Sequence, residues 1–213
     1  MKASLSVLSV ALLALMIFWQ TSTCTAAVVT FDDLVVTSPG NATFLTNTYQ
    51  GLIWSNFAVL NAAAYTGLNG SNGYYNSMVS ISNVALNAFG APAEIDAFGT
   101  NFNFRSVYLT GAFNSNLNIE VEGLRGRSLV YSQVVVASAT SPTLFTFNFL
   151  DLDRLTFNAF GGQDAGFPVS GGAGDSHFAM DNFTFEFVPE PYSLLLATAS
   201  ALLLWPFLKR KRA

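Results

Sequence analysis

The sequence has few reactive and few charged side chains. Its 213 residues include one cysteine, Cys24, and one histidine, His177, and only 10% of them are Asp, Glu, Lys or Arg. A chain with one cysteine has no intramolecular disulfide to stabilise it. Hydrophobic residues make up 51% of the sequence, so a packed core must stabilise the fold.

Residues 28–188 contain no lysine. They contain four arginines and twelve acidic residues, so their net charge is −8. Because binding to nucleic-acid phosphates depends on cationic side chains, this charge argues against nucleic acid as a partner. Divalent cations and neutral glycans are better candidate ligands.

The residues that catalysis would need are also scarce. His177 stands beside an apolar strand in a Gly-rich segment, which favours a role at the start of that strand over a general base. Glu120 and Glu122 share the predicted solvent face of one strand, whereas a glycosidase pair usually comes from different elements that flank a cleft. We therefore predict that the protein is not an enzyme. The alternative is a hydrolase that acts on matrix polysaccharide.

The N-terminus has the layout of a secretory signal peptide. Lys2 precedes an apolar stretch from Val7 to Trp19, and small or polar residues follow up to Ala27. We predict a signal peptide over residues 1–27, with cleavage after Ala27. A lipoprotein signal that uses Cys24 is the competing interpretation.

The C-terminus contains three segments in a fixed order. Val188-Pro189-Glu190-Pro191 is followed by seventeen apolar or weakly polar residues, 192–208, and then by four cations, Lys209, Arg210, Lys211 and Arg212. Seventeen helical residues are just enough to cross a hydrocarbon core of about 30 Å, and the cations favour a cytoplasmic C-terminus. A helix packed in a soluble core is the alternative, but such a helix would show a polar face. We predict a transmembrane helix over 192–208.

This order resembles the PEP-CTERM sorting signal of exopolysaccharide-producing Gram-negative bacteria. Pro189, Glu190 and Pro191 match the motif, 192–208 the apolar segment and 209–212 the basic tail. The resemblance covers 188–213 and implies recognition by a membrane-embedded exosortase. It implies export through the inner membrane, transient anchoring there, and delivery to the cell surface or the extracellular matrix.

Residues 28–187 have the size of one domain and alternate with a period of two. Leu117, Ile119 and Val121 alternate with polar residues, and similar patterns recur over 145–149, 155–159 and 183–187. Turn-forming residues separate these runs, and no amphipathic helix is evident. We predict an all-β fold, an antiparallel β-sandwich of the jelly-roll type. Residues 58–90 read as loops around one or two strands, one of them near Met78 to Ile81.

Three segments resemble extracellular domains of the galactose-binding-like jelly-roll type. They are 31–34 as an opening strand, 49–57 as an early loop and strand, and 177–183 as the closing strand. The resemblance implies a structural calcium between the first and last strands, held by Asp32 or Asp33 together with Asp181. Calcium takes six to eight oxygen ligands, so backbone carbonyls and water would complete the shell. The alternative is that these acids only cap turns.

Aromatic residues in Asn- and Gly-rich segments predict a glycan-binding surface. Tyr49, Trp54, Tyr74 and Tyr75 are the candidates, because aromatic faces suit the C–H faces of sugar rings. The alternative is that these rings belong to the core. The sequence therefore predicts a secreted structural, adhesive or exopolysaccharide-binding protein, or an ectodomain adapted to an unrelated ligand.

Overall fold

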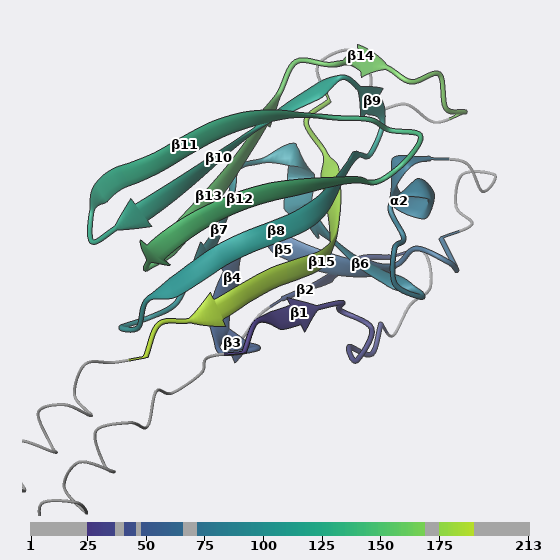
Figure 1. Ribbon diagram of the computed structural model, residues 1–213. Helices are drawn as coiled ribbons and strands as arrows, with labels where there is room; N and C mark the ends of the chain where they lie inside the picture. Colours follow the sequence, from purple (N-terminus) through teal and green to yellow (C-terminus); the bar gives the residue numbers. More distant parts are fainter. Residues whose placement is uncertain (1–24, 37–40, 46–47, 66–71, 169–174, 190–213) are drawn as a thin grey trace, which may run out of the picture.

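The computed structural model describes residues 25–36, 41–45, 48–65, 72–168 and 175–189. Two antiparallel sheets dominate this part of the chain, and the core lies between them (Figure 1). The all-β prediction is confirmed, and the arrangement is that of a β-sandwich. The predicted signal peptide, except 25–27, and the predicted sorting segment beyond Pro189 lie outside the described residues.

The larger sheet has seven strands, and its central strand is the last strand of the described chain. In spatial order the main path is β12 (Thr143–Leu152), β8 (Phe102–Gly111), β15 (Phe178–Phe187), β6 (Asn83–Asn87), β5 (Phe57–Asn61) and β2 (Thr43–Phe44). The seventh strand, β1 (Ala27–Val29), pairs with β15.

The second sheet has six strands and contains the longest hairpin. Its order is β11 (Ser128–Ala137), β10 (Leu117–Arg125), β13 (Arg154–Phe160), β7 (Ala93–Asp96), β4 (Leu52–Ser55) and β3 (Thr48–Tyr49). A short pair, β9 (Asn114–Ser115) and β14 (Gln163–Asp164), a single-turn helix, α2 (Gly73–Asn76), and the turn η1 (Ala88–Gly90), in which Phe89 is not helical, complete the described elements.

The alternation predicted from the sequence places phenylalanine rings in the core. Leu117, Ile119 and Val121 point inward from β10 and are fully buried. Phe104 stacks between two rings, with its centroid 4.8 Å from that of Phe147 and 4.9 Å from that of Phe183. Burial of one Phe side chain contributes about 1.5–3 kcal/mol to the stability of the fold. These rings are therefore a large part of what stabilises it without disulfides.

A second apolar cluster covers the outer face of β5 and β6. Phe57 and Val59 face the main core, whereas Ala58 and Leu60 on the opposite face pack with Tyr74 of α2. Asn72 caps α2 by accepting a hydrogen bond from the Tyr75 N–H, 3.0 Å away. Both faces of these strands are therefore buried, which explains their uninterrupted apolar sequence.

Two predicted strands are wrong. Residues 31–34 form a turn, closed by a 3.1 Å bond from the Leu34 N–H to the Phe31 carbonyl, and the opening strand is β1. Met78 to Ile81 form a loop, and the strand begins at Asn83. The Asp181 carboxylate accepts N–H groups of the 78–81 loop, and the Asp32 carboxylate of the 31–34 turn accepts the Asn83 N–H at the end of that loop.

The two ends of the domain leave it at the same side. β1 and β15 are antiparallel with Ala27 opposite Phe185, so the chain enters where β15 ends. Within the described residues no helix has the length and hydrophobicity needed to span a bilayer.

Candidate functional site

The structure brings two of the three predicted calcium ligands to one loop, where they accept hydrogen bonds. Asp181 is fully buried, and its carboxylate accepts the N–H groups of Val79 and Ser80 at 2.7 and 2.8 Å. The Ser80 hydroxyl and the Asn182 N–H also donate to it, at 2.9 and 2.7 Å. Asp32 accepts the Asn83 N–H at 2.9 Å, at the other end of the same loop.

This geometry does not fit a calcium ion bound by Asp181, because both of its oxygens already face N–H or O–H donors rather than an open coordination position. Asp33 is occupied separately, since it accepts the Tyr49 hydroxyl at 2.5 Å. Among the described residues no three His, Cys, Asp or Glu side chains gather as a metal site would require. Burial raises the pKa of Asp181, and the donors around it oppose that rise.

Trp54 and Tyr74, which were predicted as possible glycan platforms, are core residues. Trp54 is 3% exposed, and its ring meets Phe57 and Phe183 edge to face, each at 5.3 Å between centroids. Tyr74 is 5% exposed in the second cluster, with its centroid 5.5 Å from that of Phe113. Their faces are covered by protein, so neither ring is available to a sugar.

Tyr49 and Tyr75 remain partly accessible but are not neighbours in one site. Tyr49 packs against the main core, 6.0 Å from Phe31 between centroids, while Tyr75 lies on α2 and is 44% exposed. Burial and the hydrogen bond to Asp33 raise the pKa of Tyr49, which holds its hydroxyl as a donor. The four predicted aromatic residues therefore do not form one surface.

The most exposed aromatic rings are phenylalanines that the sequence analysis missed. Phe98 is 83% exposed and Phe89 is 80% exposed, and both have positive φ, 35° and 57°. A non-glycine residue at positive φ is uncommon and marks a backbone held by its surroundings. Phe160, 45% exposed at the end of β13, is a third exposed phenylalanine, although its φ is not positive.

A repeated sequence pattern accompanies these three rings. Each lies in an Asx-Ala-Phe-Gly segment, at 87–90, 96–99 and 158–161. The alanine is buried in each case, and the glycine has a φ between 64° and 87°. The alanine thus anchors the turn, the glycine reverses the chain, and the phenylalanine between them is turned outward. This repeat is the signal that could have identified the rings from the sequence.

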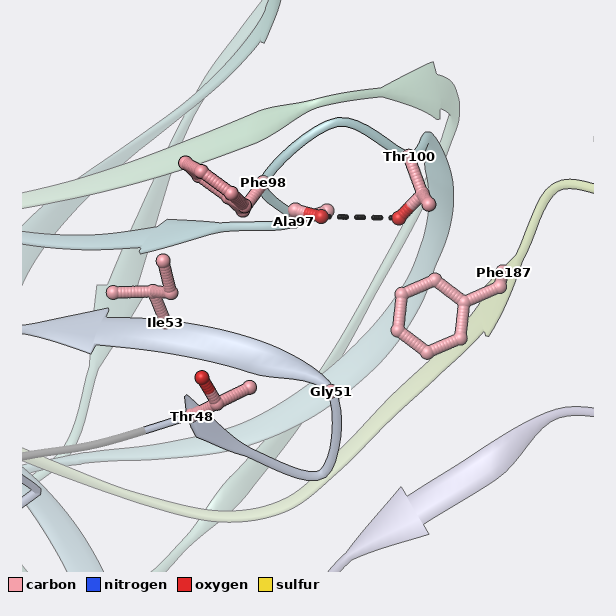
Figure 2. A pocket seen from close by; sticks show the side chains of 7 residues that line it. All are labelled: Thr48, Gly51, Ile53, Ala97, Phe98, Thr100 and Phe187. Carbon is pink, nitrogen blue, oxygen red and sulfur yellow. Dashed lines mark hydrogen bonds between the residues drawn. The ribbon is translucent and has the colours of Figure 1, made fainter.

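A pocket of about 320 Å³ lies beside Phe98, and Figure 2 shows its lining. Phe98 and Phe187 stand on opposite sides of it, and the Ala97–Thr100 turn runs between them. The remaining lining comes from the β3–β4 hairpin, namely Thr48, Gly51 and Ile53. Segments from three distant parts of the chain therefore meet here, at the end where β15 leaves the domain.

The turn that carries Phe98 is held by hydrogen bonds on both sides. The Phe98 N–H donates to the Asp96 carboxylate at 2.7 Å, and the Thr100 hydroxyl donates to the Ala97 carbonyl at 3.0 Å. Asp96 in turn accepts from Arg154 at 2.9 Å, which raises the pKa of that arginine. These hydrogen bonds fix the turn from which the Phe98 ring projects into solvent.

The hairpin side of the pocket depends on Gly51. Gln50 and Gly51 both have positive φ, 54° and 78°, as a two-residue hairpin turn requires. A Cβ on Gly51 would also lie 2.9 Å from the Phe187 ring, closer than real Cβ contacts. Glycine at this position therefore leaves room for the Phe187 ring in the pocket wall.

The pocket has a lining of apolar and hydroxyl-bearing side chains. Its lining is mostly apolar, with two threonine hydroxyls and two aromatic rings, and no titratable side chain is among the residues that line it. Elsewhere, the His177 Nδ1 is paired with Asp175 at 2.8 Å, and the neighbouring Ser176 hydroxyl donates to the Gly90 carbonyl. Glu122 accepts the Thr156 hydroxyl on the outer face of the six-stranded sheet. None of these groups faces the pocket lining.

The chain is similar to known proteins in structure but not in sequence. No protein-family model matches the sequence, and no curated protein matches it. Among solved structures, the chain is similar to the carbohydrate-binding module TmCBM61, whose structure was solved in complex with β-1,4-galactotriose. The two are 11% identical over 73% of this chain and 97% of that one, with a TM-score of 0.33. A similarity of this size does not establish a shared family or ligand.

Proposed function

We propose that this protein is an exported, non-catalytic matrix protein whose β-sandwich binds exopolysaccharide at the pocket beside Phe98. The observation that carries the proposal is that an 83% exposed ring, Phe98, and a second ring, Phe187, line the same mostly apolar pocket. An exposed aromatic side chain held on a braced turn loses little conformational entropy when a ligand packs on it.

The pocket offers the two kinds of contact that a sugar needs. Phe98 and Phe187 supply apolar faces for the C–H groups of a pyranose ring, and the hydroxyls of Thr48 and Thr100 supply polar contacts at its edge. Its volume lies at the small end of ligand pockets, which span about 300–1,000 Å³. We infer that it takes one sugar unit, such as a branch or chain end.

The sorting route belongs to the same proposal. The PEP-CTERM-like segment at 188–213 would hold the exported domain at the inner membrane until an exosortase processes it, as the residue pattern implies. The adjacent positions of Ala27 and Phe185 support this arrangement, because both membrane-directed ends then leave one side of a galactose-binding-like jelly roll. Released into the matrix, the domain would have a structural or adhesive role.

A retention experiment tests the proposal. The protein purified from the producing bacterium is passed over immobilised exopolysaccharide of that strain, next to its Phe98→Ala and Phe89→Ala variants. Phe89 is the matched control, since it is equally exposed on the same kind of turn but does not line the pocket. We expect Phe98→Ala alone to lose retention, with no reducing ends released. Reducing ends that accumulate with time would establish a hydrolase instead.

A further inference from the structure

The β-sandwich has two long edge strands and three very short ones. β1, β2 and β3 contribute three, two and two residues to their edges, whereas β11 and β12 each run for ten. An edge strand presents a row of backbone N–H and C=O groups that another strand can pair with, so natural proteins protect long edges. The protection of β11 and β12 differs.

β12 is protected in two ways. Its register against β8 shifts twice, and Asn148 and Asp151 adopt positive φ at these irregularities. Near its end, the Arg125 guanidinium donates to the carbonyls of Asp151 and Leu150 at 2.6 and 3.2 Å. Bulges and a charged side chain at the edge both prevent a further strand from pairing.

β11 lacks both devices over most of its length. It pairs with β10 without a register shift from Tyr131 to Ala137, and the one irregularity lies toward the hairpin turn. Its outward row contains Val130, Val134 and Val136, which are 42%, 49% and 53% exposed. Within the described chain β10 is the strand that pairs with it, so the opposite edge of β11 is unpaired.

The charge distribution allows a second copy of the domain to approach this edge. Residues 128–150 contain no charged side chain, although residues 28–188 carry a net charge of −8. Two copies of the domain carry the same net charge and repel each other, but the exposed row of β11 itself is neutral, and Glu120, opposite Val134, lies one strand back from the edge. Antiparallel pairing about a two-fold axis brings the same valine row of each copy together, which makes the strand complementary to itself.

We propose that β11 is a self-association edge, at which two copies of this chain pair antiparallel and join their six-stranded sheets into one. A ten-residue strand is about 33 Å long, enough for a continuous ladder of backbone hydrogen bonds. This pairing is independent of glycan binding, because β11 does not contribute to the pocket lining. In a matrix protein it would give each particle two glycan sites.

Sedimentation of the full chain in non-ionic detergent tests the proposal. The unaltered protein should be a dimer, and the Val134→Lys/Val136→Lys variant should dissociate at least about tenfold more readily, because it adds two cations of the same sign to each of the two edges that would pair. Both side chains are half exposed, so the variant should fold; circular dichroism verifies this. The Val134→Thr/Val136→Thr variant is the matched control and should stay dimeric. A monomeric unaltered protein at about 100 µM, or a Lys variant as dimeric as the control, would overturn the proposal.

Cysteine cross-linking gives an independent second measurement. In a Cys24→Ser chain, cysteines are placed one at a time at positions 131–135, and Asn158→Cys, at an exposed position of the inner strand β13, is the control. An antiparallel two-fold pair should cross-link strongly at the one or two positions nearest the axis and weakly elsewhere. Cross-linking equal to that of the Asn158 control at every position would contradict the pairing.

Discussion

Ala27 lies opposite Phe185 in the antiparallel ladder between β1 and β15, and Val28 lies opposite Thr184. This pair of strands joins the first and last described elements of the domain. It places the proposed signal-peptide junction next to the end of β15, just before the start of the proposed sorting segment, although the two are separated by more than 150 residues of sequence. A signal peptidase that cuts after Ala27 would leave Val28 as the first residue of the strand.

The register of these strands predicts a disulfide. Val28→Cys/Thr184→Cys in a Cys24→Ser chain should form an intramolecular bond, because directly opposed residues of an antiparallel pair have Cα atoms about 4.5–5.5 Å apart, within the range that disulfides bridge. Mass spectrometry with and without reductant measures it. Val28→Cys/Asn118→Cys, whose second position lies in the other sheet, should stay reduced; equal oxidation of the two variants would show that the register is wrong.

Asp181 should stabilise the fold through its hydrogen bonds, with or without calcium. Asp181→Asn replaces one acceptor oxygen by a donor facing N–H groups, so we expect the free energy of unfolding to fall by about 2–4 kcal/mol. Asp164→Asn, on the exposed β14, is the control and should change little. Denaturation is followed in calcium and in chelator. A calcium-dependent stability that disappears in Asp181→Asn would restore the predicted calcium site.

Glu186 should make part of the stability depend on pH. Hydrogen bonds from Asn103 and Arg105 lower the pKa of Glu186 below its ordinary 4.5. A carboxyl group with a lowered folded-state pKa stabilises the fold above the unfolded value, and this contribution disappears as pH falls through the folded value. The melting temperatures of the unaltered protein and of Glu186→Gln should therefore differ at pH 7 and converge below pH 4.5. A constant difference down to the lowest pH would argue against the pairing.

The sorting proposal predicts where variants accumulate. Replacing Pro189, Glu190 and Pro191 with alanines should leave the precursor in the inner membrane of an exosortase-bearing host, as should expression of the unaltered chain in a host without exosortase. Fractionation and immunoblotting measure the distribution. The Phe98→Ala variant is the control and should be released normally. Release of the triple-alanine variant at the normal rate would rule out this motif as the signal.

The strands that bury one face were predictable from the sequence. Leu117, Ile119 and Val121 alternate with polar residues because only one side of β10 meets the core, and the same pattern marks the second half of β15, from Phe183 on. β5 and β6 were not, because α2 and its neighbours cover their second face and remove the alternation. A period of two reports burial on one face and is lost when both faces are buried.

Most of the candidate site could not be predicted from the sequence. The polar residues near Trp54 in the sequence suggested that its ring is exposed. In the structure the Trp54 side chain points from β4 into the core and is buried. Phe98 looked like any apolar residue near a strand, and its exposure follows from positive φ in a turn braced by Asp96. The pocket also needs Phe187, from the far end of the chain, which only the sheet topology brings close.

Isothermal titration with oligosaccharides cut from the producing strain's exopolysaccharide tests the central claim most directly. We predict that Phe98→Ala raises the dissociation constant about tenfold, the loss expected for one aromatic stacking contact, while Phe89→Ala leaves it unchanged. Circular dichroism should show that both variants keep the fold. Equal dissociation constants for the unaltered protein and Phe98→Ala, or no binding of any of these oligosaccharides to the unaltered protein, would contradict the glycan-binding pocket.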